Sequence, residues 1–351
     1  MLNGISLEER WGEMHIAPRM KFAAAMLLLL ALAPAPETRA TEAGDRLPRT
    51  LLSGHSYVRL LSWARARGFE ARWVTKDKTL ELSNGQTRLT FTVDPRQDGR
   101  QARINGVDVW LAFPVVPHNG SPYISQVDLD RTLAPVLSPR PSAPGSVLHT
   151  ICIDPGHGGK DPGNQSGSRD EKRYTLLLAQ ELREKLTRAG FQVFLTRNND
   201  NYVPLDSRSE IARQRKADLF VSLHFNSSGI GHPEVRGVEV YCLTPAGAFS
   251  TNAGGEGDTH PCDGNRYDDR NMLLAYQTQK ALCRSLPVED RGVKRARYQV
   301  LRDAAMPGIL IEGGFMTNAA EARHIDDAGY RQDMARAIAE GIQNYWRQIK
   351  S

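Results

Sequence analysis

The sequence has few cysteines, few aromatic residues and little excess charge. Four Cys in 351 residues are too few for a disulfide scaffold, so the chain needs an ordinary hydrophobic core, and its length favours two domains. The 20 Pro and 30 Gly show no short period, which excludes a collagen-like or low-complexity chain. With 40% hydrophobic residues and a net charge of only +5, the composition predicts a globular protein and argues against nucleic acid as a partner.

Only one stretch is strongly apolar, and it lies near the N-terminus. Residues 22–35 read FAAAMLLLLALAPA and follow the cations Arg19 and Lys21. This run is too short to span a bilayer comfortably, but with the small residues between Ala35 and Ala40 it is typical of a secretory signal peptide. We expect residues 1–40 to be removed, no stable membrane span to remain, and the protein to be periplasmic or cell-wall associated. An uncleaved anchor or a buried helix is the alternative.

Export permits disulfides, and four Cys allow three connectivities. Cys242 and Cys262 bracket a Gly-rich stretch, and a bond between them would stabilise the fold by roughly 3 kcal/mol. Cys152 lies in an apolar strand and is expected to be a buried thiol. We treat Cys242–Cys262 as a possible disulfide and leave the pairing open.

The Pro-rich segment 138–148 predicts a linker between a small domain (46–137) and a larger one (149–348). The small domain is predicted to be α+β, with one helix from Val58 to Arg67 that ends at Gly68. Its hairpin turns are predicted at Asn84-Gly85, Asn105-Gly106 and Asn119-Gly120.

A faint repeat relates the two ends of the small domain. SGHSYVRLLSWARA, from Ser53, is similar to NGSPYISQVDLDRTL, from Asn119. This pattern resembles the copper-amine-oxidase N-terminal-like stalk domain of secreted wall enzymes, although Arg59 stands where that family usually has Pro. Residues 45–140 hold 14 basic and 9 acidic residues, a surplus of five. We therefore expect residues 46–137 to contact the anionic cell wall, and the alternative is a spacer without a ligand.

From His149 onward, apolar strands alternate with helices, which predicts an α/β domain with a mixed, mostly parallel sheet flanked by helices. Strands are predicted at 149–153, 191–196, 218–225, 237–243, 298–301 and 309–311. Helices are predicted at 174–188, 207–216, 270–286 and 330–348.

The first of these strands leads into DPGHGGKDPG, a Gly-rich turn that presents His157 at the strand's carboxyl end. A phosphate-binding loop is excluded, because that motif needs Gly at Asp154 and Ser or Thr at Asp161. His224 likewise ends an apolar strand, and Glu171 opens a helix. Two His and one carboxylate around a divalent ion leave a fourth position for water, as in catalytic zinc sites.

Glu312 follows another apolar strand and is a candidate general base. Each of these residues also has a structural alternative. A single His at a strand end is more often structural, and Glu171 can favour a helix N-terminus through the helix dipole, as can Asp170. Their joint occurrence in one order favours the functional interpretation.

That order resembles the zinc-dependent N-acetylmuramoyl-L-alanine amidases of the type 3 family. The matching segments are ICIDPGHGGKDPG, the helix start at Glu171, FLTRNND, ADLFVSLHFNS and ILIEGGFMTN. Departures are small: Phe225 stands where Ala is usual, and Gly313-Gly314 replaces a commoner pair. The resemblance implies one Zn²⁺ ion held by His157, Glu171 and His224, with Glu312 catalytic, and substrate binding by Asn226 and Arg208.

The implied reaction is cleavage of the amide between N-acetylmuramic acid and the stem-peptide L-Ala of peptidoglycan, by zinc-activated water with Glu312 as general base and acid. Alternatives are a zinc peptidase acting on wall peptides and a non-catalytic wall-binding protein. Some similar enzymes carry a helical plug over the zinc that an activating partner removes. The corresponding segment here, 244–269, is predicted to be a surface loop, although Glu256 or His260 can still reach the metal. An activator, if there is one, is not specified by the sequence.

Overall fold

The computed structural model describes residues 47–229, 232–253 and 257–350, and the account below concerns these parts. The predicted signal peptide lies outside the described residues. Contacts group residues 40–351 into one compact unit. Among the described residues, no helix has both the length and the apolar character needed to cross a membrane.

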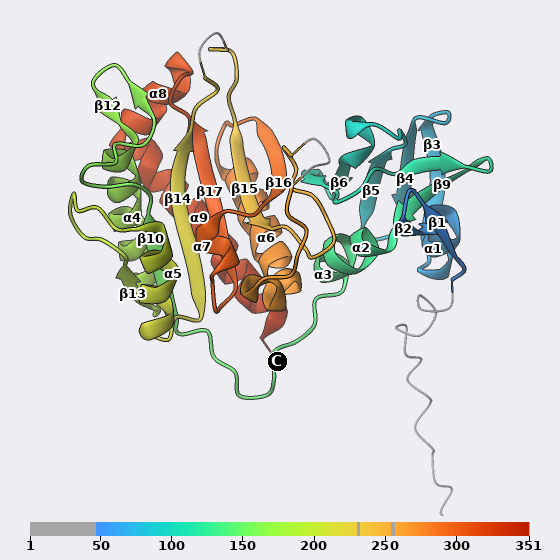
Figure 1. The fold of residues 1–351 in the computed structure, drawn as a ribbon, viewed down its shortest axis with the longest axis horizontal. Coiled ribbons are helices and arrows are strands. Elements are labelled where there is room, and N and C mark those ends of the chain that lie inside the picture. The colour runs from blue at the N-terminus through green and yellow to red at the C-terminus, as the bar shows by residue number, and fades with distance from the viewer. Residues whose placement is uncertain (1–46, 230–231, 254–256, 351) are drawn as a thin grey trace, which may run out of the picture. The chain divides into compact units, whose positions relative to one another are not determined.

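The larger half of the chain is built on a mixed sheet, coloured from green to orange in Figure 1. Strands β13, β10, β14 and β17 run parallel, β15 joins β17 antiparallel, and β16 lies parallel to β15. The prediction of a mixed, mostly parallel sheet is thereby confirmed. The strands are β10 (Thr150–Pro155), β13 (Gln192–Leu195), β14 (Leu219–Asn226), β15 (Val238–Leu243), β16 (Asp290–Ala296) and β17 (Gly308–Phe315).

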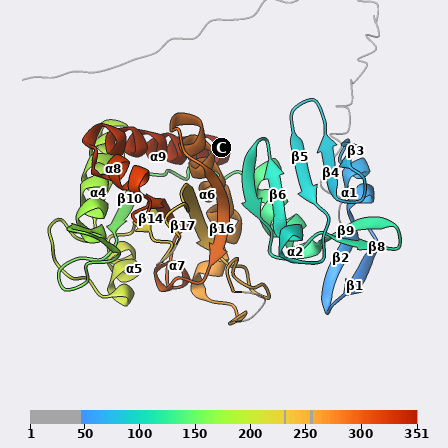
Figure 2. The same ribbon diagram turned by 90° about the horizontal axis from the view of Figure 1, so that it is seen from above.

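Helices cover both faces of this sheet, as Figure 2 shows from above. On one face, α4 (Glu171–Arg188), α6 (Asp268–Ser285) and α9 (Ala328–Ile349) bury their apolar sides in the main core. On the other face lie α5 (Leu205–Gln214) and the single turn α7 (Gln299–Arg302), which belong to a second core cluster. The other short elements of this half are β11 (Gln165–Ser166), β12 (Arg169–Asp170), η3 (Asp263–Tyr267) and α8 (Ala319–Asp326).

The first half of the described chain contains two further groups of strands. A four-stranded sheet has the order β1 (Arg49–Leu52), β2 (His55–Arg59), β9 (Ser121–Ser125) and β8 (Val116–His118). An antiparallel series contains β3 (Glu70–Thr75), β4 (Thr79–Ser83), β5 (Arg88–Thr92), β6 (Gln101–Ile104) and β7 (Val107–Trp110). β7 pairs with β16 at Val109 and Val293, so this series continues the large sheet.

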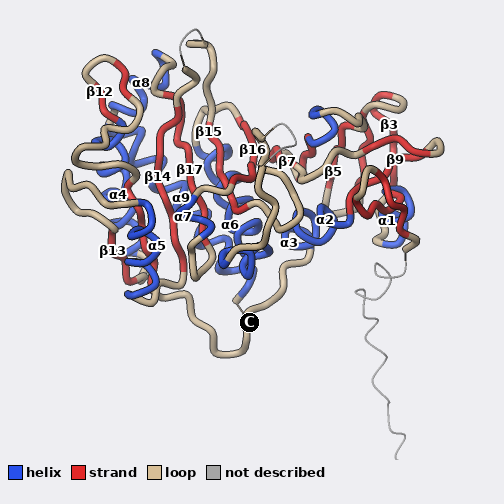
Figure 3. Tube along the Cα trace, in the orientation of Figure 1, coloured by secondary structure: helices blue, strands red, loops and turns tan. Residues whose placement is uncertain are grey.

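Helices in this half are short: α1 (Leu60–Ala66), η1 (Gln97–Arg100), α2 (Gln126–Asp128), η2 (Leu129–Leu133) and α3 (Ala134–Leu137). The three predicted Asn-Gly turns connect β4 to β5, β6 to β7 and β8 to β9, as the sequence indicated. Residues 138–149, which follow α3, form neither helix nor strand (Figure 3). The boundary between a small and a large domain stays a prediction.

One predicted strand near residue 300 is wrong, and a neighbouring strand was not predicted. Residues 298–301 were expected to form a strand, but α7 occupies 299–302, and the strand β16 lies earlier, at 290–296. β16 was missed because its sequence, DRGVKRA, has no apolar pattern. Its Lys294 and Arg295 are nevertheless buried, since Lys294 pairs with Glu239 and Arg295 donates to the Thr132 hydroxyl.

The possible disulfide between Cys242 and Cys262 is not formed: all four Cys are free thiols. Side chains alternate along β15, so Cys242 enters the main core with Val240 while Tyr241 and Leu243 face the second core cluster. Cys262 packs against that second cluster. The two thiols therefore lie toward opposite faces of the sheet. Cys152 is fully buried, as predicted.

Candidate metal centre and active site

The turn after β10 brings the chain very close to β14. A side chain at Gly156 would place its Cβ 2.2 Å from Cε1 of His224, so only Gly fits there. The next residue, His157, has a φ of 62°, a left-handed conformation that is unusual for a non-Gly residue. The Gly-rich sequence thus allows this strained turn and places His157 beside His224, with ring centroids 4.9 Å apart.

Glu171 begins α4 and is only 1% exposed. One carboxylate oxygen accepts a hydrogen bond from the Phe225 backbone N–H (3.0 Å) and lies 3.0 Å from Nδ1 of His224. The other accepts from the Asn164 N–H (2.8 Å) and lies 3.1 Å from Nε2 of His157. Asp170, the alternative capping residue, makes no side-chain cap hydrogen bond. Glu171 therefore does more than begin a helix, because its carboxylate faces both imidazoles.

The three predicted ligands converge. His157, Glu171 and His224 each offer a ligand atom, and all these atoms lie within 4.8 Å of one another. Asp161 lies 2.9 Å from Nδ1 of His157 and so leaves Nε2 directed at the site, the usual outer support of a metal-binding His. Two imidazoles and one carboxylate fit a divalent transition metal such as zinc.

The electrostatics of this cluster favour a charged Glu171. Burial alone would raise the pKa of Glu171, but the hydrogen bonds and charges of His157 and His224 outweigh burial and hold that pKa well below its usual value. Burial likewise opposes charge on His157, yet Glu171 and Asp161 raise its pKa. The charged carboxylate of Glu171 and the two imidazoles are thus all available as ligands for a cation.

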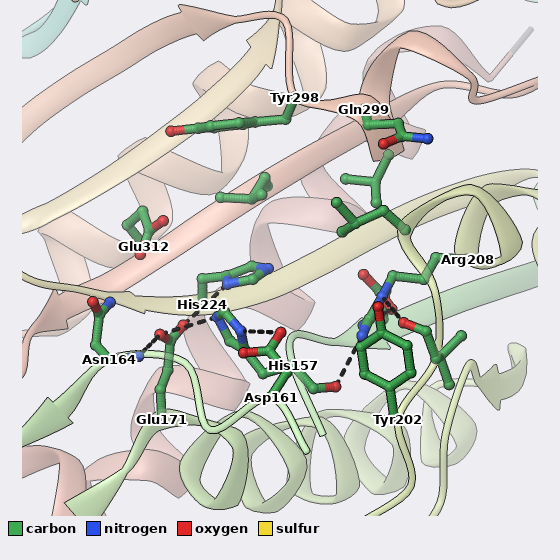
Figure 4. Close-up of a pocket in the computed structure, with 15 residues that line it drawn as sticks. His157, Asp161, Asn164, Glu171, Tyr202, Arg208, His224, Tyr298, Gln299 and Glu312 are labelled. Atoms are coloured by element: carbon green, nitrogen blue, oxygen red, sulfur yellow. Dashed lines mark hydrogen bonds and ion pairs between the residues drawn. The ribbon is translucent and has the colours of Figure 1, made fainter. Parts of the chain in front are cut away.

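A cavity of about 410 Å³ opens beside these ligands (Figure 4). Glu312, on β17, faces it next to His224, its register partner on β14. Tyr298 and Gln299 line the side opposite Glu171. The remaining wall includes the partly exposed Tyr202 and Leu205, which the sequence analysis did not identify.

Glu312 is partly buried, and its Oε2 is shielded from solvent. Burial, and then the negative charges of Glu171 and Glu239, raise its pKa well above the usual value, while Lys294 acts in the opposite direction. Within the part of the chain that the structure describes, Oε2 of Glu312 has no hydrogen-bond partner. Glu312 nevertheless lines the cavity, so it lies at the candidate site beside the metal-ligating cluster.

A buried ion-pair network lies directly behind Glu312. Glu239, the cross-strand neighbour of Glu312 on β15, is 1% exposed. Its carboxylate forms an ion pair with Nζ of Lys294 at 2.7 Å. Arg291 and the Tyr241 hydroxyl also donate to Glu239. The sequence analysis missed this network, although an acid inside the apolar strand VEVYCL was a visible signal. Lys294 and Arg291 stabilise the buried charge of Glu239, and Lys294 offsets part of the effect of that charge on Glu312.

The two predicted substrate-binding residues have other contacts in the structure. Asn226 does not line the cavity; its Oδ1 accepts from the Ser227 N–H, and its amide lies 3.5 Å from Glu239. Arg208 touches the cavity wall but is 2% exposed. Substrate binding by these two residues stays a prediction; of the two, only Arg208 lines the cavity.

Arg208 instead holds the turn that carries His157. Its guanidinium forms an ion pair with Asp154 (2.8 Å) and donates to the carbonyls of Pro155 and His157, each at 2.9 Å. Arg197 donates to the carbonyls of Pro155 (3.0 Å) and Gly156 (2.8 Å). Three successive carbonyl groups of the strained turn are thus fixed by two buried guanidinium groups.

In the segment 244–269, the described residues 244–253 and 257–262 are irregular, as predicted, but the last residues are helical in η3 and the start of α6. His260 is exposed, with its side chain beside Asp258, and lies outside the group of metal-ligating side chains found among the described residues. Glu256 lies outside the described residues. No described residue of 244–269 lines the active-site cavity.

Comparisons with known proteins agree with this site. Residues 151–344 match the Amidase_3 family, described as N-acetylmuramoyl-L-alanine amidase. The amidase AmiC of Neisseria meningitidis is 37% identical over 221 residues, 56% of this chain and 52% of that protein. AmiA of Escherichia coli is 34% identical, over 56% of this chain and 75% of that protein.

Two further matches cover a similar share of this chain. LytC of Bacillus subtilis is 34% identical over 57% of this chain, but the match spans only 36% of LytC. The solved structure of AmiC2 from Nostoc punctiforme is 34% identical over 58% of this chain and 99% of that chain, with a TM-score of 0.49. The chain thus spans about half or less of the first two curated relatives.

We expect Arg208→Lys to weaken metal binding by about 10- to 100-fold, because Lys cannot hold Asp154 and two carbonyls at once. Zinc affinity of the metal-free protein, measured by competition with a chromophoric chelator, tests this. Arg213→Lys, an exposed substitution on the same helix, is the control and should bind as the wild type does. Equal affinities in a folded Arg208→Lys protein would show that the guanidinium does not position His157.

Proposed function

We propose, because the chain belongs to the Amidase_3 family of N-acetylmuramoyl-L-alanine amidases, that it is a zinc-dependent peptidoglycan hydrolase. The bond cleaved is the amide between N-acetylmuramic acid and L-Ala of the stem peptide. The observation that carries the proposal is the convergence of His157, Glu171 and His224 beside Glu312 at one open cavity. These residues all lie within the segment that matches the family.

Zinc, when bound, would polarise the amide carbonyl and make water a better nucleophile. His157, Glu171 and His224 would hold the ion. Asp161 supports this role by its contact with Nδ1 of His157. Two imidazoles and a carboxylate also suit other transition metals, so zinc is proposed on the chemistry of the donor set.

Glu312 would take a proton from the attacking water and return it to the leaving amine. Its raised pKa supports this role, because it makes the carboxylate a stronger base toward water and brings its pKa nearer the working pH, where the proton can also be returned. The Glu239–Lys294 pair supports the position of Glu312 from the neighbouring strand.

To be cleaved, the substrate amide must lie between Glu312 and the metal ligands. The other residues of the cavity can then contact the sugar and the peptide on either side of that amide. Tyr298 and Tyr202 are 38% and 43% exposed, respectively. Aromatic faces of this kind pack against sugar rings or peptide groups. These two residues, with Gln299, are better candidates for substrate contact than Asn226 or Arg208.

The remaining features of the proposal concern where the protein works. The predicted signal peptide supports export to the periplasm or cell wall, where peptidoglycan is accessible. The exposed position of His260 supports a site that residues 244–253 and 257–269 leave open. An activating partner is not required by this arrangement.

Digestion of purified peptidoglycan by the mature protein tests the proposal. We expect release of intact stem peptides with an L-Ala N-terminus, identified by mass spectrometry, and loss of release with a chelator until zinc is restored. A zinc peptidase would instead leave shortened peptides attached to muramic acid. Finding only such products, or finding no hydrolysis in zinc-loaded protein, would contradict the proposed activity.

Glu312→Gln tests the role of the carboxyl group. The amide nearly preserves its shape but cannot accept the proton, so turnover should fall by about 100- to 10,000-fold. Zinc content, measured by atomic emission, should remain near one ion per chain because Glu312 is outside the predicted ligand set. Glu340→Gln, on the surface of α9, is the matched control. Near-normal turnover in Glu312→Gln would remove Glu312 from the mechanism.

A further inference from the structure

We propose that a second cavity, in the first half of the chain, binds the carboxylate groups of peptidoglycan stem peptides. This inference rests on the proposed function for the choice of polymer. The cavity lies between the β1–β2 and β8–β9 hairpins and the segment around residues 95–100, and its volume is about 590 Å³. That size is within the range of small-molecule sites. It shares no lining residue with the active-site cavity.

The walls are aromatic and largely preformed. His55 on β2 packs on Phe113, with ring centroids 4.0 Å apart, and Phe113 is 6% exposed. Tyr57 is also buried, and its hydroxyl donates to the carbonyl of Pro114 at 3.2 Å. His118, on β8, lies edge-on to Tyr123. The cavity is therefore built from packed rings and not from loose surface side chains.

Three polar side chains that line this cavity have no hydrogen-bonding or ion-pair partner in the protein. Among the interactions of the described residues, Arg96, His55 and His118 make no side-chain hydrogen bond and no ion pair. Arg96 is exposed at the rim, and only its backbone is hydrogen-bonded: its N–H donates to Asp94 and its carbonyl accepts from the Gly99 N–H. One guanidinium and two imidazoles thus offer N–H donors to a ligand.

A second guanidinium group shapes the cavity. Arg100 is 4% exposed and donates to the Leu111 carbonyl at 2.9 Å and to the Phe249 carbonyl at 3.3 Å. Phe249, from the segment after β15, completes the wall. Because Arg100 is engaged with backbone carbonyls and the buried carboxylate of Asp128 offsets part of its charge, it mainly adds rigidity, while Arg96 and the two His contact the ligand.

The polar groups and the charge around this cavity favour an anionic ligand. Donors without acceptors, beside a buried guanidinium, suit an anion, and the aromatic walls suit the apolar parts of a small peptide. Residues 47–137 contain 12 basic and 8 acidic residues, so the surrounding surface also favours an anion. Stem peptides carry several carboxylates, whereas the glycan backbone between them is neutral apart from lactyl groups that the peptides cap. A site of this kind would keep the enzyme beside strands that still carry peptides.

The test uses the full mature chain with Glu312→Gln, so that the probe is not consumed. The probe is the free stem tetrapeptide, compared with the same peptide with its carboxylates converted to amides, with chitotetraose and with inorganic phosphate. We expect the tetrapeptide to shift the ring C–H signals of His55 and His118 in NMR spectra. The amidated peptide and chitotetraose should not shift them, and phosphate should do so only at much higher concentration.

Two charge-reversal variants locate the binding. Arg96→Glu should weaken tetrapeptide binding by about tenfold or more, since a hydrogen bond between charged groups is lost. Lys76→Glu makes the same charge change on an exposed turn outside the cavity and should bind like the parent. Equal weakening in both variants would indicate a diffuse surface effect, and shifts by phosphate at the tetrapeptide's concentration would indicate a general anion site; either result overturns the proposal.

The test of the second cavity and the test of the proposed amidase activity can succeed or fail independently. In chains that retain Glu312, Arg96→Glu should leave cleavage of a soluble muropeptide unchanged, because Arg96 is not among the residues that line the active-site cavity. Normal amide cleavage without histidine shifts would defeat the second site and leave the amidase proposal intact. Shifts of the His55 and His118 signals without any amide cleavage would defeat the amidase proposal and leave the second site intact.

Discussion

The buried carboxylate of Glu171 is the contact on which the candidate site depends. It reaches both imidazoles while accepting two backbone N–H groups, and it does so from the first residue of a long helix. A charge at 1% exposure is costly unless it is fully compensated. Here His157, His224 and the two backbone groups supply that compensation, and a bound cation would add to it.

That requirement extends into the surrounding fold. His157 can face Glu171 only because the turn after β10 adopts left-handed backbone angles, and Arg197 and Arg208 hold the carbonyls of that turn. His224 can approach only because position 156 has no side chain. The parallel strands β10, β14 and β17 bring these groups to a common edge of the sheet. The same few residues therefore determine both the backbone path of this turn and the positions of the candidate metal ligands.

Much of this arrangement could be predicted from the sequence, because apolar strands ending in His or Glu are strong local signals. The four residues His157, Glu171, His224 and Glu312 do lie together around one cavity. The pattern could not reveal β16, whose buried Lys294 is explained only by its partner Glu239. Nor could it show that Arg208 turns inward toward Asp154, since a surface Arg and a buried one look the same in sequence.

The central claim is that His157, Glu171 and His224 together hold one zinc ion. X-ray absorption at the zinc edge of the zinc-loaded full chain tests it most directly. The account predicts a first shell of nitrogen and oxygen only, with two imidazoles, and loss of tight zinc binding in Glu171→Gln. A sulfur ligand from any of the four free thiols, or unchanged zinc binding without the Glu171 carboxylate, would contradict it.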